Sequence, residues 1–361
     1  MAMRRLGRLT ALAVTMMVMG SGLTAPAGAT SVSCGQVITR HTVLQADVGP
    51  CPDNGIVVGA DNVRLNLNGY RILGTPQTGD GAGVLVVERR GVHVTNGTVS
   101  DFDAGVAIVG GGGNRVAQVT ARDNIGQARV PSQGIAGTRY GDGIAILSSS
   151  DNLLLRNVAE NNGPFAGIGL YAEIDADHPR EIGGPTRNNV VNGNVVRDNR
   201  ACRTPTGPCD NDGIRLEPGV QANLIVNNEV TGSGLDGIAV FSRNTTDNEI
   251  KHNVVRGNGF HHVGHRKGDG IRVFGRNVAL NLPGGDRTLI ENNQVFGNAA
   301  NGIRVDAQFS RIINNKTGAN VQVVDPRFFL QSDLHDSNED CDANVWSGNT
   351  FDKAYPDCTK G

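Results

Sequence analysis

A short glycine-led pattern recurs through most of the sequence and limits what the chain can fold into. The pattern is a glycine, an aliphatic residue, a variable residue and a second aliphatic residue. It begins at Gly55, Gly83, Gly105, Gly143, Gly167, Gly213, Gly237, Gly270 and Gly302. The closest copies lie 22 and 24 residues apart, and the other intervals are longer by an insertion. A period of this length, with strand-like segments and no helical unit, is typical of a β-solenoid with one coil per repeat.

Asparagine residues keep step with the glycine-led pattern. Six successive repeats carry one in an Asn-x-aliphatic setting: Asn157, Asn194, Asn228, Asn253, Asn293 and Asn315. In four of these repeats another asparagine stands five residues earlier: Asn152, Asn189, Asn223 and Asn248. If each repeat is one coil, equivalent side chains lie ~4.8 Å apart and can hydrogen-bond along the axis. We therefore interpret these asparagines as structural.

The repeats resemble those of right-handed parallel β-helix proteins of the pectin-lyase-like superfamily. The segment IGGPTRNNVVNGN, at Ile182–Asn194, is similar to repeats of many secreted members, and the resemblance covers roughly Cys34 to Asp325. It implies an all-β fold, namely a single-stranded right-handed parallel β-helix of about nine coils with disulfide-stapled end caps. It implies less about activity, because this fold carries lyases, hydrolases, epimerases and binding proteins.

The two ends of the chain differ from the repeats. Three arginines precede an apolar run at Leu9–Met19, and small residues follow at Ala27–Ala29, so we expect residues 1–29 to be a signal peptide cleaved near Ala29. The run is too short to span a bilayer, and we expect a secreted protein without a membrane span. We expect an N-terminal cap at 30–54, the β-helix at 55–332 and a C-terminal cap at 333–361. Loss of the three arginines lowers the formal net charge from −2 to −5, which argues against a nucleic-acid partner.

Six cysteines remain after the expected signal peptide, an even number that fits disulfide bonds in an exported chain. They form three pairs that are local in sequence: Cys34 with Cys51, Cys202 with Cys209, and Cys341 with Cys358. Local pairing is favoured because stacked coils keep sequence neighbours close and separate the two ends. A zinc site is the alternative, but the sequence contains no Cys-x-x-Cys.

The variable residue of each glycine-led strand should point outward, because its aliphatic neighbours point inward. In the later repeats this residue is Arg215, Arg272 and Arg304, with Arg272 and Arg304 expected on adjacent coils and Arg215 two coils before Arg272. Phe241 and Phe274 complete this predicted substrate-binding face. Such a row of arginines suits the carboxylates of a sugar chain. The alternative is a solvated face whose arginines pair with nearby aspartates and with Glu217.

Aspartates stand directly before four of the glycine-led strands, at Asp142, Asp212, Asp236 and Asp269. The resemblance implies that acidic residues beside such a sheet hold Ca²⁺ while an arginine or lysine removes a proton, so Asp212 and Asp236 are candidate Ca²⁺ ligands. The alternative is that Asp-Gly serves only as turn chemistry.

Insertions flank the same strands and could wall a groove, since function concentrates in loops on a rigid scaffold. One group precedes the strand, at 125–141, 200–211 and 260–268, and the other follows it, at 172–187 and 275–287. The segment HHVGHRKGD, at His261–Asp269, is the most unusual. His265 or Lys267 could accept a proton there, next to Asp269, while Arg272 holds a uronate carboxylate. Metal binding by the histidines and a solvated basic loop are the alternatives.

The preferred hypothesis is a secreted β-helix protein that binds an acidic polysaccharide across the arginine-lined face. Cleavage or epimerisation of that ligand is left open, because the paired-Asp and Gly-His-Gly motifs of polygalacturonase-like hydrolases are missing. One alternative is a non-catalytic solenoid of adhesion, envelope or carbohydrate-binding type. Another is a periplasmic accessory protein of a copper enzyme, which the lack of methionine after residue 29 disfavours.

Overall fold

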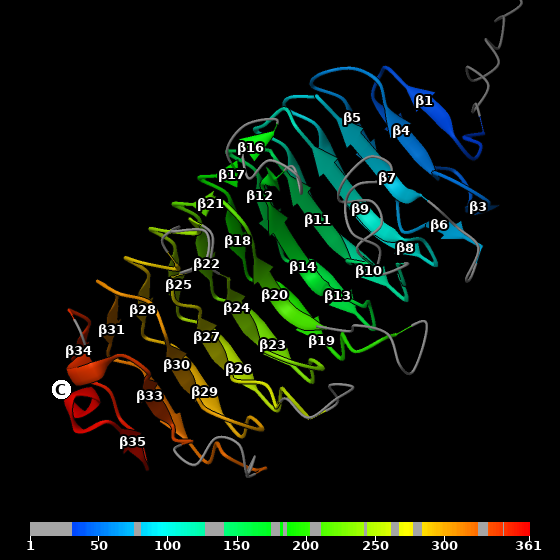
Figure 1. Cartoon of the computed structure of the whole chain (residues 1–361). Helices are drawn as coiled ribbons and strands as arrows, with labels where there is room; N and C mark the ends of the chain where they lie inside the picture. The colour runs from blue at the N-terminus through cyan, green and yellow to red at the C-terminus, as the bar shows by residue number, and fades with distance from the viewer. Residues whose placement is uncertain are drawn as a thin grey trace, which may run out of the picture. The chain divides into compact units, whose positions relative to one another are not determined.

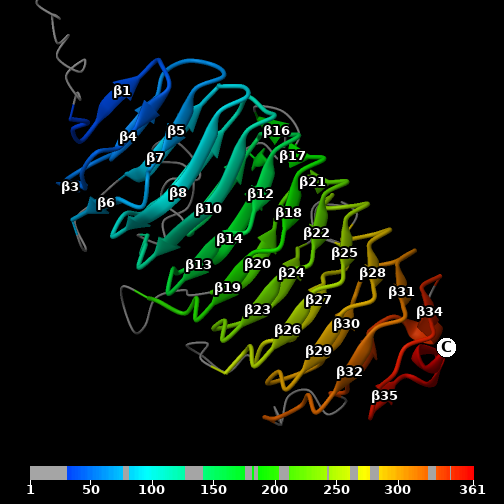
Figure 2. The ribbon, with the colours of Figure 1, turned by 180° about the vertical axis from the view of Figure 1, so that it is seen from behind.

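Stacked coils of parallel β-strands make up the described part of the chain (Figures 1 and 2). The computed structural model describes residues 31–75, 81–126, 141–174, 181–182, 186–202, 211–241, 244–260, 267–276, 284–323, 331–341 and 343–361. Ser31–Gly361 is one compact unit. The predicted all-β parallel β-helix is confirmed. None of the helices in these ranges is both long enough and apolar enough to cross a membrane.

One sheet of twelve strands, here called sheet A, takes one strand from each coil, and every neighbouring pair in it is parallel. Its strands, in spatial order, are β1 (Gln36–Ile38), β4 (Ile56–Val58), β7 (Ala82–Val87), β9 (Ala104–Val109), β11 (Ile144–Leu147), β14 (Ala166–Tyr171), β20 (Asp212–Leu216), β24 (Ile238–Val240), β27 (Ile271–Val273), β30 (Ile303–Val305), β33 (Leu334–Asp336) and β35 (Ala354–Tyr355). The spatial order follows the chain order, as expected of a solenoid.

Two further parallel sheets, B and C, close each coil. They join where β8 (His93–Ser100) and β10 (Arg115–Arg122) continue from one into the other. Sheet B also contains β2 (Thr42–Val43), β5 (Arg64–Asn66), β12 (Leu153–Leu155), β18 (Val190–Asn192), β22 (Leu224–Val226), β25 (Glu249–Lys251), β28 (Leu289–Glu291), β31 (Arg311–Ile313) and β34 (Val345–Ser347). Sheet C also contains β3 (Val48–Cys51), β6 (Arg71–Gly74), β13 (Val158–Glu160), β19 (Val195–Arg197), β23 (Glu229–Thr231), β26 (Val254–Arg256), β29 (Gln294–Phe296) and β32 (Lys316–Gly318).

A few short elements lie outside the three sheets. β15 (Glu173–Ile174) pairs antiparallel with β16 (Glu181–Ile182), and β17 (Thr186–Arg187) pairs in parallel with β21 (Val220–Gln221). Two 3-10 helices, η1 (Glu339–Cys341) and η2 (Asp357–Lys360), lie near the C-terminus.

Aliphatic side chains from the three sheets fill the inside of the solenoid in stacked rows. In sheet A, Ile214, Ile238, Ile271 and Ile303 pair in register and are all fully buried. The rows belong to one continuous core cluster that runs from Ile38 to Trp346. Full burial of such a side chain stabilises the fold by about 1.5–3 kcal/mol. The core therefore grows with each added coil, which is how a narrow solenoid becomes stable.

The repeated glycine is required by close packing at the corner between sheets C and A. A Cβ on Gly237 would lie 2.5 Å from a methyl of Val255 and 2.6 Å from the carbonyl oxygen of Gly270 in the next coil. It would also lie 2.8 Å from the amide nitrogen of Asn258. Any side chain would push neighbouring coils apart, so the glycine keeps its place in each repeat.

Asparagine ladders run along the solenoid, as predicted. Asn253 is fully buried; its Nδ2 donates to Oδ1 of Asn293 at 3.0 Å, and its own Oδ1 accepts from the backbone N–H and Nδ2 of Asn228. This ladder joins Asn157, Asn194, Asn228, Asn253, Asn293, Asn315 and Asn349. A second ladder joins Asn152, Asn189, Asn223 and Asn248. The structural interpretation of these asparagines is confirmed.

A third ladder was not predicted, although it continues the same five-residue spacing. It joins Asn124, Asn162 and Asn199 in one stretch and Asn258, Asn298 and Asn320 in another. Ser233 stands between the two stretches, and its backbone N–H donates to Asn258 Oδ1 at 3.0 Å. Each coil thus turns at buried amide groups that satisfy the backbone of the neighbouring coil.

Disulfide bonds lie near both ends of the described chain. Cys34 bonds to Cys51 and Cys341 to Cys358, each closing a separation of 17 residues, so both predicted terminal pairs are confirmed. Cys202 is also disulfide-bonded, and its predicted partner Cys209 lies outside the described residues. At the C-terminal end, Trp346 pairs in register with Ile312 and covers the last core positions.

We expect reduction to loosen the two ends before the middle. Each terminal disulfide constrains a short segment at a solenoid end, whereas the central coils are held on both sides by ladders and core. Addition of a reductant should therefore increase the rate of hydrogen exchange first in residues 34–51 and 341–358. A uniform gain over all coils, or a bridge between the two ends found by mass mapping, would contradict this expectation.

Candidate functional site

The outward-facing residues of sheet A form one straight row along the solenoid. Arg215, Ala239, Arg272 and Arg304 pair in register on successive strands, so the predicted positions of the arginines are confirmed. Beyond Arg304 the row continues through His335 on β33 and Tyr355 on β35. Neighbouring members lie one strand spacing apart, ~4.8 Å. We call this stretch, from Arg215 to Tyr355, the polar row.

The earlier part of the same face is apolar and closed. Leu85, Ala107 and Ala145 point outward from sheet A but are buried in two small apolar clusters. At Gly169 the missing side chain makes room for Tyr171, whose ring occupies the space that a Cβ would need. The polar side chains that point outward from sheet A therefore gather on the polar row.

Aromatic rings and arginines stack against one another within the polar row. The guanidinium of Arg215 lies 3.9 Å from the ring centroid of Phe241, and that of Arg272 lies 4.0 Å from the centroid of Phe274. The two phenylalanine rings are themselves stacked, with centroids 4.1 Å apart and planes 14° apart. This arrangement brings together four predicted site residues. It also fixes the arginine side chains, because a planar guanidinium stacks well on an aromatic face.

Every arginine of the polar row also has an acidic partner. Arg215, only 4% exposed, contacts Asp212 at 2.9 Å and also Glu217, and Arg304 contacts Asp306 at 2.8 Å. Arg272 shares Asp306 at 3.3 Å and lies 3.9 Å from Asp269. The pairing with Glu217 is the one that the alternative interpretation of this face expects. The row is thus a network of charge pairs.

The charges of this network shift the pKa values of its members. Burial of Asp306 by itself would raise the pKa of that carboxyl, but Arg304 and Arg272 together hold it below its ordinary value. Burial would lower the pKa of Arg272, whereas the carboxylates of Asp269, Asp236 and Asp306 raise it. Both groups are therefore charged at neutral pH.

The aspartates that precede the glycine-led strands are buried and support the backbone. Oδ1 of Asp212 accepts the N–H of Asp236, Oδ1 of Asp236 accepts that of Asp269, and Oδ1 of Asp269 accepts that of Asn301. These bonds join neighbouring coils, so the aspartates form a structural ladder like that of the asparagines and not the local turn that the alternative interpretation expects. Within the described residues, no three His, Cys, Asp or Glu side chains come together to hold a metal ion, and Asp212 and Asp236 take part in this ladder.

The predicted catalytic residues are only partly brought together. Asp269 is buried and lies near Arg272, and Lys267 is half-buried two residues before Asp269. His265 lies outside the described residues, as do 261–266 as a whole. Most residues of the predicted insertions also lie outside the described residues. The two ends of an insertion are hydrogen-bonded to each other in two cases: the N–H of Gly268 donates to the carbonyl of Gly259, and that of Gly285 donates to the carbonyl of Phe274. The insertions therefore start from both margins of sheet A.

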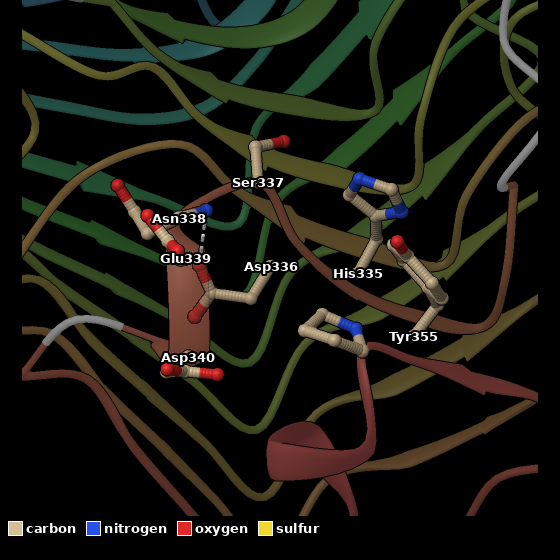
Figure 3. A pocket seen from close by; sticks show the side chains of 8 residues that line it. His335, Asp336, Ser337, Asn338, Glu339, Asp340 and Tyr355 are labelled. Carbon is tan, nitrogen blue, oxygen red and sulfur yellow. Dashed lines mark hydrogen bonds between the residues drawn. The ribbon is translucent and has the colours of Figure 1, made fainter.

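A pocket that the sequence did not reveal lies at the C-terminal end of the polar row (Figure 3). Its volume is about 510 Å³, and its lining is His335, Asp336, Ser337, Asn338, Glu339, Asp340, Tyr355 and Pro356. The rings of His335 and Tyr355 face each other, with centroids 5.7 Å apart. The glycine-led pattern stops before this coil, so no sequence signal placed His335 in the row.

Comparison with known proteins supports the fold. A family model described as a right handed beta helix region matches residues 54–255 and 208–353. No curated protein matches the sequence. Among solved structures, the Dettilon tailspike protein is 16% identical, with a TM-score of 0.57 over 88% of this chain and 59% of the tailspike chain.

Two other solved structures are similar to a comparable degree. An alginate lyase from Paenibacillus is 15% identical, with a TM-score of 0.54 over 87% of this chain and 90% of its own. The A-module of a mannuronan C-5 epimerase from Azotobacter vinelandii is 13% identical, with a TM-score of 0.56 over 89% of this chain and 83% of its own. Likeness at these identities is a likeness of fold.

Proposed function

Because the chain belongs to the right-handed β-helix family, whose sheets are rigid platforms, we propose that it binds an acidic polysaccharide along the outer face of sheet A. The observation that carries this proposal is the stacked pair Phe241–Phe274 between Arg215 and Arg272, with Arg304 next in the same row. The disulfide bonds are typical of a protein outside the cytoplasm. Export by residues 1–29 is part of the proposal.

The spacing of the polar row suits an extended sugar chain. The length of one pyranose unit in such a chain is close to the ~4.8 Å between neighbouring strands. A polysaccharide that runs along the solenoid can therefore present one sugar to each coil. Phe241 and Phe274 are half-buried, and the ring edges that their stacking leaves open can pack against the apolar side of a sugar ring.

The paired charges suit a sugar that carries both hydroxyl and carboxylate groups. A guanidinium has five N–H donors, more than one carboxylate uses, so one arginine can hold a protein carboxylate and a ligand oxygen together. Asp306 accepts from both Arg272 and Arg304 and keeps the two side chains aimed at the same space. The names of two similar structures refer to alginate and mannuronan, which are uronic-acid polymers, and this supports the choice of ligand.

We expect Arg272→Ala to weaken binding of polygalacturonate or alginate about tenfold, more than Arg272→Lys does, because lysine keeps the charge but loses the planar stack on Phe274. Phe241→Ala should also weaken binding. Arg64→Ala, on sheet B, is the matched control and should change affinity little. Affinity should fall with added salt, since exposed charges are screened beyond ~8 Å at physiological ionic strength. Calorimetry measures each value.

Two outcomes of this experiment would change the proposal. Equal affinity of Arg272→Ala and Arg64→Ala would place the ligand elsewhere, and no binding to any acidic glycan would overturn the proposal.

Lyase or epimerase activity is the second candidate, based on Lys267 beside Asp269 and Arg272. Products that absorb in the ultraviolet, with or without Ca²⁺, would support the lyase if they vanish in Lys267→Ala or His265→Ala while binding persists.

A further inference from the structure

The pocket at the C-terminal end of the polar row has the chemistry of a sugar site that differs from the arginine positions. We propose that it binds a sugar unit without a carboxylate, either neutral or amino-substituted, directly beside the uronate held at Arg304. The natural ligand is then a mixed chain in which a non-uronate unit follows the uronates held at Arg272 and Arg304. This inference rests on the proposed function and specifies its substrate class.

The pocket continues the row that the glycan follows. His335 pairs in register with Arg304, and Tyr355 pairs in register with His335. One strand spacing separates each pair, so a chain with one unit per coil that places a carboxylate at Arg304 places its next unit at His335. No change of direction is needed, because all of these strands belong to sheet A.

The walls of the pocket suit hydroxyl groups and a sugar ring face. Tyr355 is 40% exposed and tilted by 34° to His335, so the two rings form an open aromatic corner (Figure 3). Tyrosine and histidine each combine an apolar ring with a hydrogen-bonding atom. Ser337 adds an exposed hydroxyl.

A buried carboxylate fixes the shape of the pocket floor. Oδ1 of Asp336 accepts from the backbone N–H and Nδ2 of Asn338, and Oδ2 accepts from Nδ2 of Asn344 and Nε1 of Trp346. Two of these bonds stay within the pocket lining, and two tie the floor to Asn344 and Trp346. A preformed site of this kind binds without the entropic cost of ordering its walls.

The charge of the pocket differs from that of the neighbouring coils. Its described lining includes Asp336, Glu339 and Asp340 but neither lysine nor arginine. A ligand carboxylate would meet like charge there, whereas hydroxyl or ammonium groups would meet acceptors. One coil earlier, Arg304 favours a carboxylate. This change of charge between adjacent coils selects a chain in which a uronate is followed by a unit without a carboxylate.

The test compares hyaluronan oligosaccharides, which alternate uronate and amino sugar, with oligogalacturonides of the same length, which carry a carboxylate on each unit. We expect Tyr355→Ala and His335→Ala to weaken hyaluronan binding about tenfold and to leave oligogalacturonide binding unchanged. Tyr355→Phe keeps the ring and should retain most of the affinity. Glu339→Gln with Asp340→Asn should strengthen oligogalacturonide binding. Phe296→Ala, an outward-facing ring on sheet C, is the control.

The outcomes separate this inference from the function on which it rests. If both glycans bind through Arg272 and neither responds to Tyr355→Ala or His335→Ala, the pocket inference fails and the proposed function stands. If neither glycan binds, both fail. If one pocket variant does not fold, the other decides, since His335 and Tyr355 lie on different strands.

Discussion

Replacing Asn253 by alanine should lower the free energy of unfolding by about 3 kcal/mol, because it strands buried groups on the neighbouring coil. The backbone N–H and the Nδ2 of Asn228 both donate to Oδ1 of Asn253, and both are fully enclosed. Nδ2 of Asn253 itself donates to Ile225 and Asn293. Asn253→Leu should do no better, since the amides above and below stay polar. Urea unfolding followed by circular dichroism measures the effect.

The control for this experiment is Asn227→Gly on the same side of the coil. Asn227 is exposed, and its φ of +57° suits glycine as well as asparagine. Its loss should change stability by less than about 0.5 kcal/mol. If Asn253→Ala, Asn227→Gly and the unaltered protein unfold with the same free energy, the ladder adds nothing to stability.

The ladders also mark how far the sequence predicted the fold. Buried amides recur at a fixed phase, so the spacing of asparagine along the chain was enough to indicate two of the ladders. The third ladder was missed because Ser233 interrupts it between Asn199 and Asn258. Ser233 continues the ladder through its backbone N–H, and a search for repeated asparagine does not detect such a residue.

The site was predicted less completely than the fold, for a physical reason. Strand alternation placed Arg272 and Arg304 on one face, because the face to which a side chain points is set by its position within its own strand. Asp306 lies two residues after Arg304 and therefore on the same face, but its contact with Arg272 depends on how two coils stack, which is not local. His335 was missed because it follows Leu334 without the leading glycine, although its strand pairs in register with β30.

A buried carboxyl should make the stability of the protein depend on pH between about 4 and 7. Burial raises the pKa of Asp142 to about 7, against the opposing effect of its hydrogen bonds with Tyr171 and Ala166 and of the charge of Arg215. Between the unfolded and folded pKa values the folded protein binds the proton and the unfolded chain does not. The free energy of unfolding should therefore fall by about 1.4 kcal/mol per pH unit, or about 4 kcal/mol in all, as the pH rises.

Asp142→Asn should remove this dependence. Asparagine keeps an oxygen for the N–H of Ala166, which Asp142 Oδ1 accepts at 2.8 Å, and carries no charge at any pH. The variant should match the unaltered protein near pH 4 and exceed it at pH 8, by up to about 4 kcal/mol in urea unfolding.

The matched variant Asp247→Asn should behave in the opposite way. Arg287, which donates two hydrogen bonds to Asp247, holds the pKa of that carboxyl below its ordinary value. Its stabilisation is present above the unfolded pKa and is lost as the pH falls through the folded one, so this variant should be the less stable one at pH 8 and converge with the unaltered protein in acid. Parallel pH profiles for the two variants would contradict the role of Asp142, because a general effect of charge removal would act on both carboxyls alike.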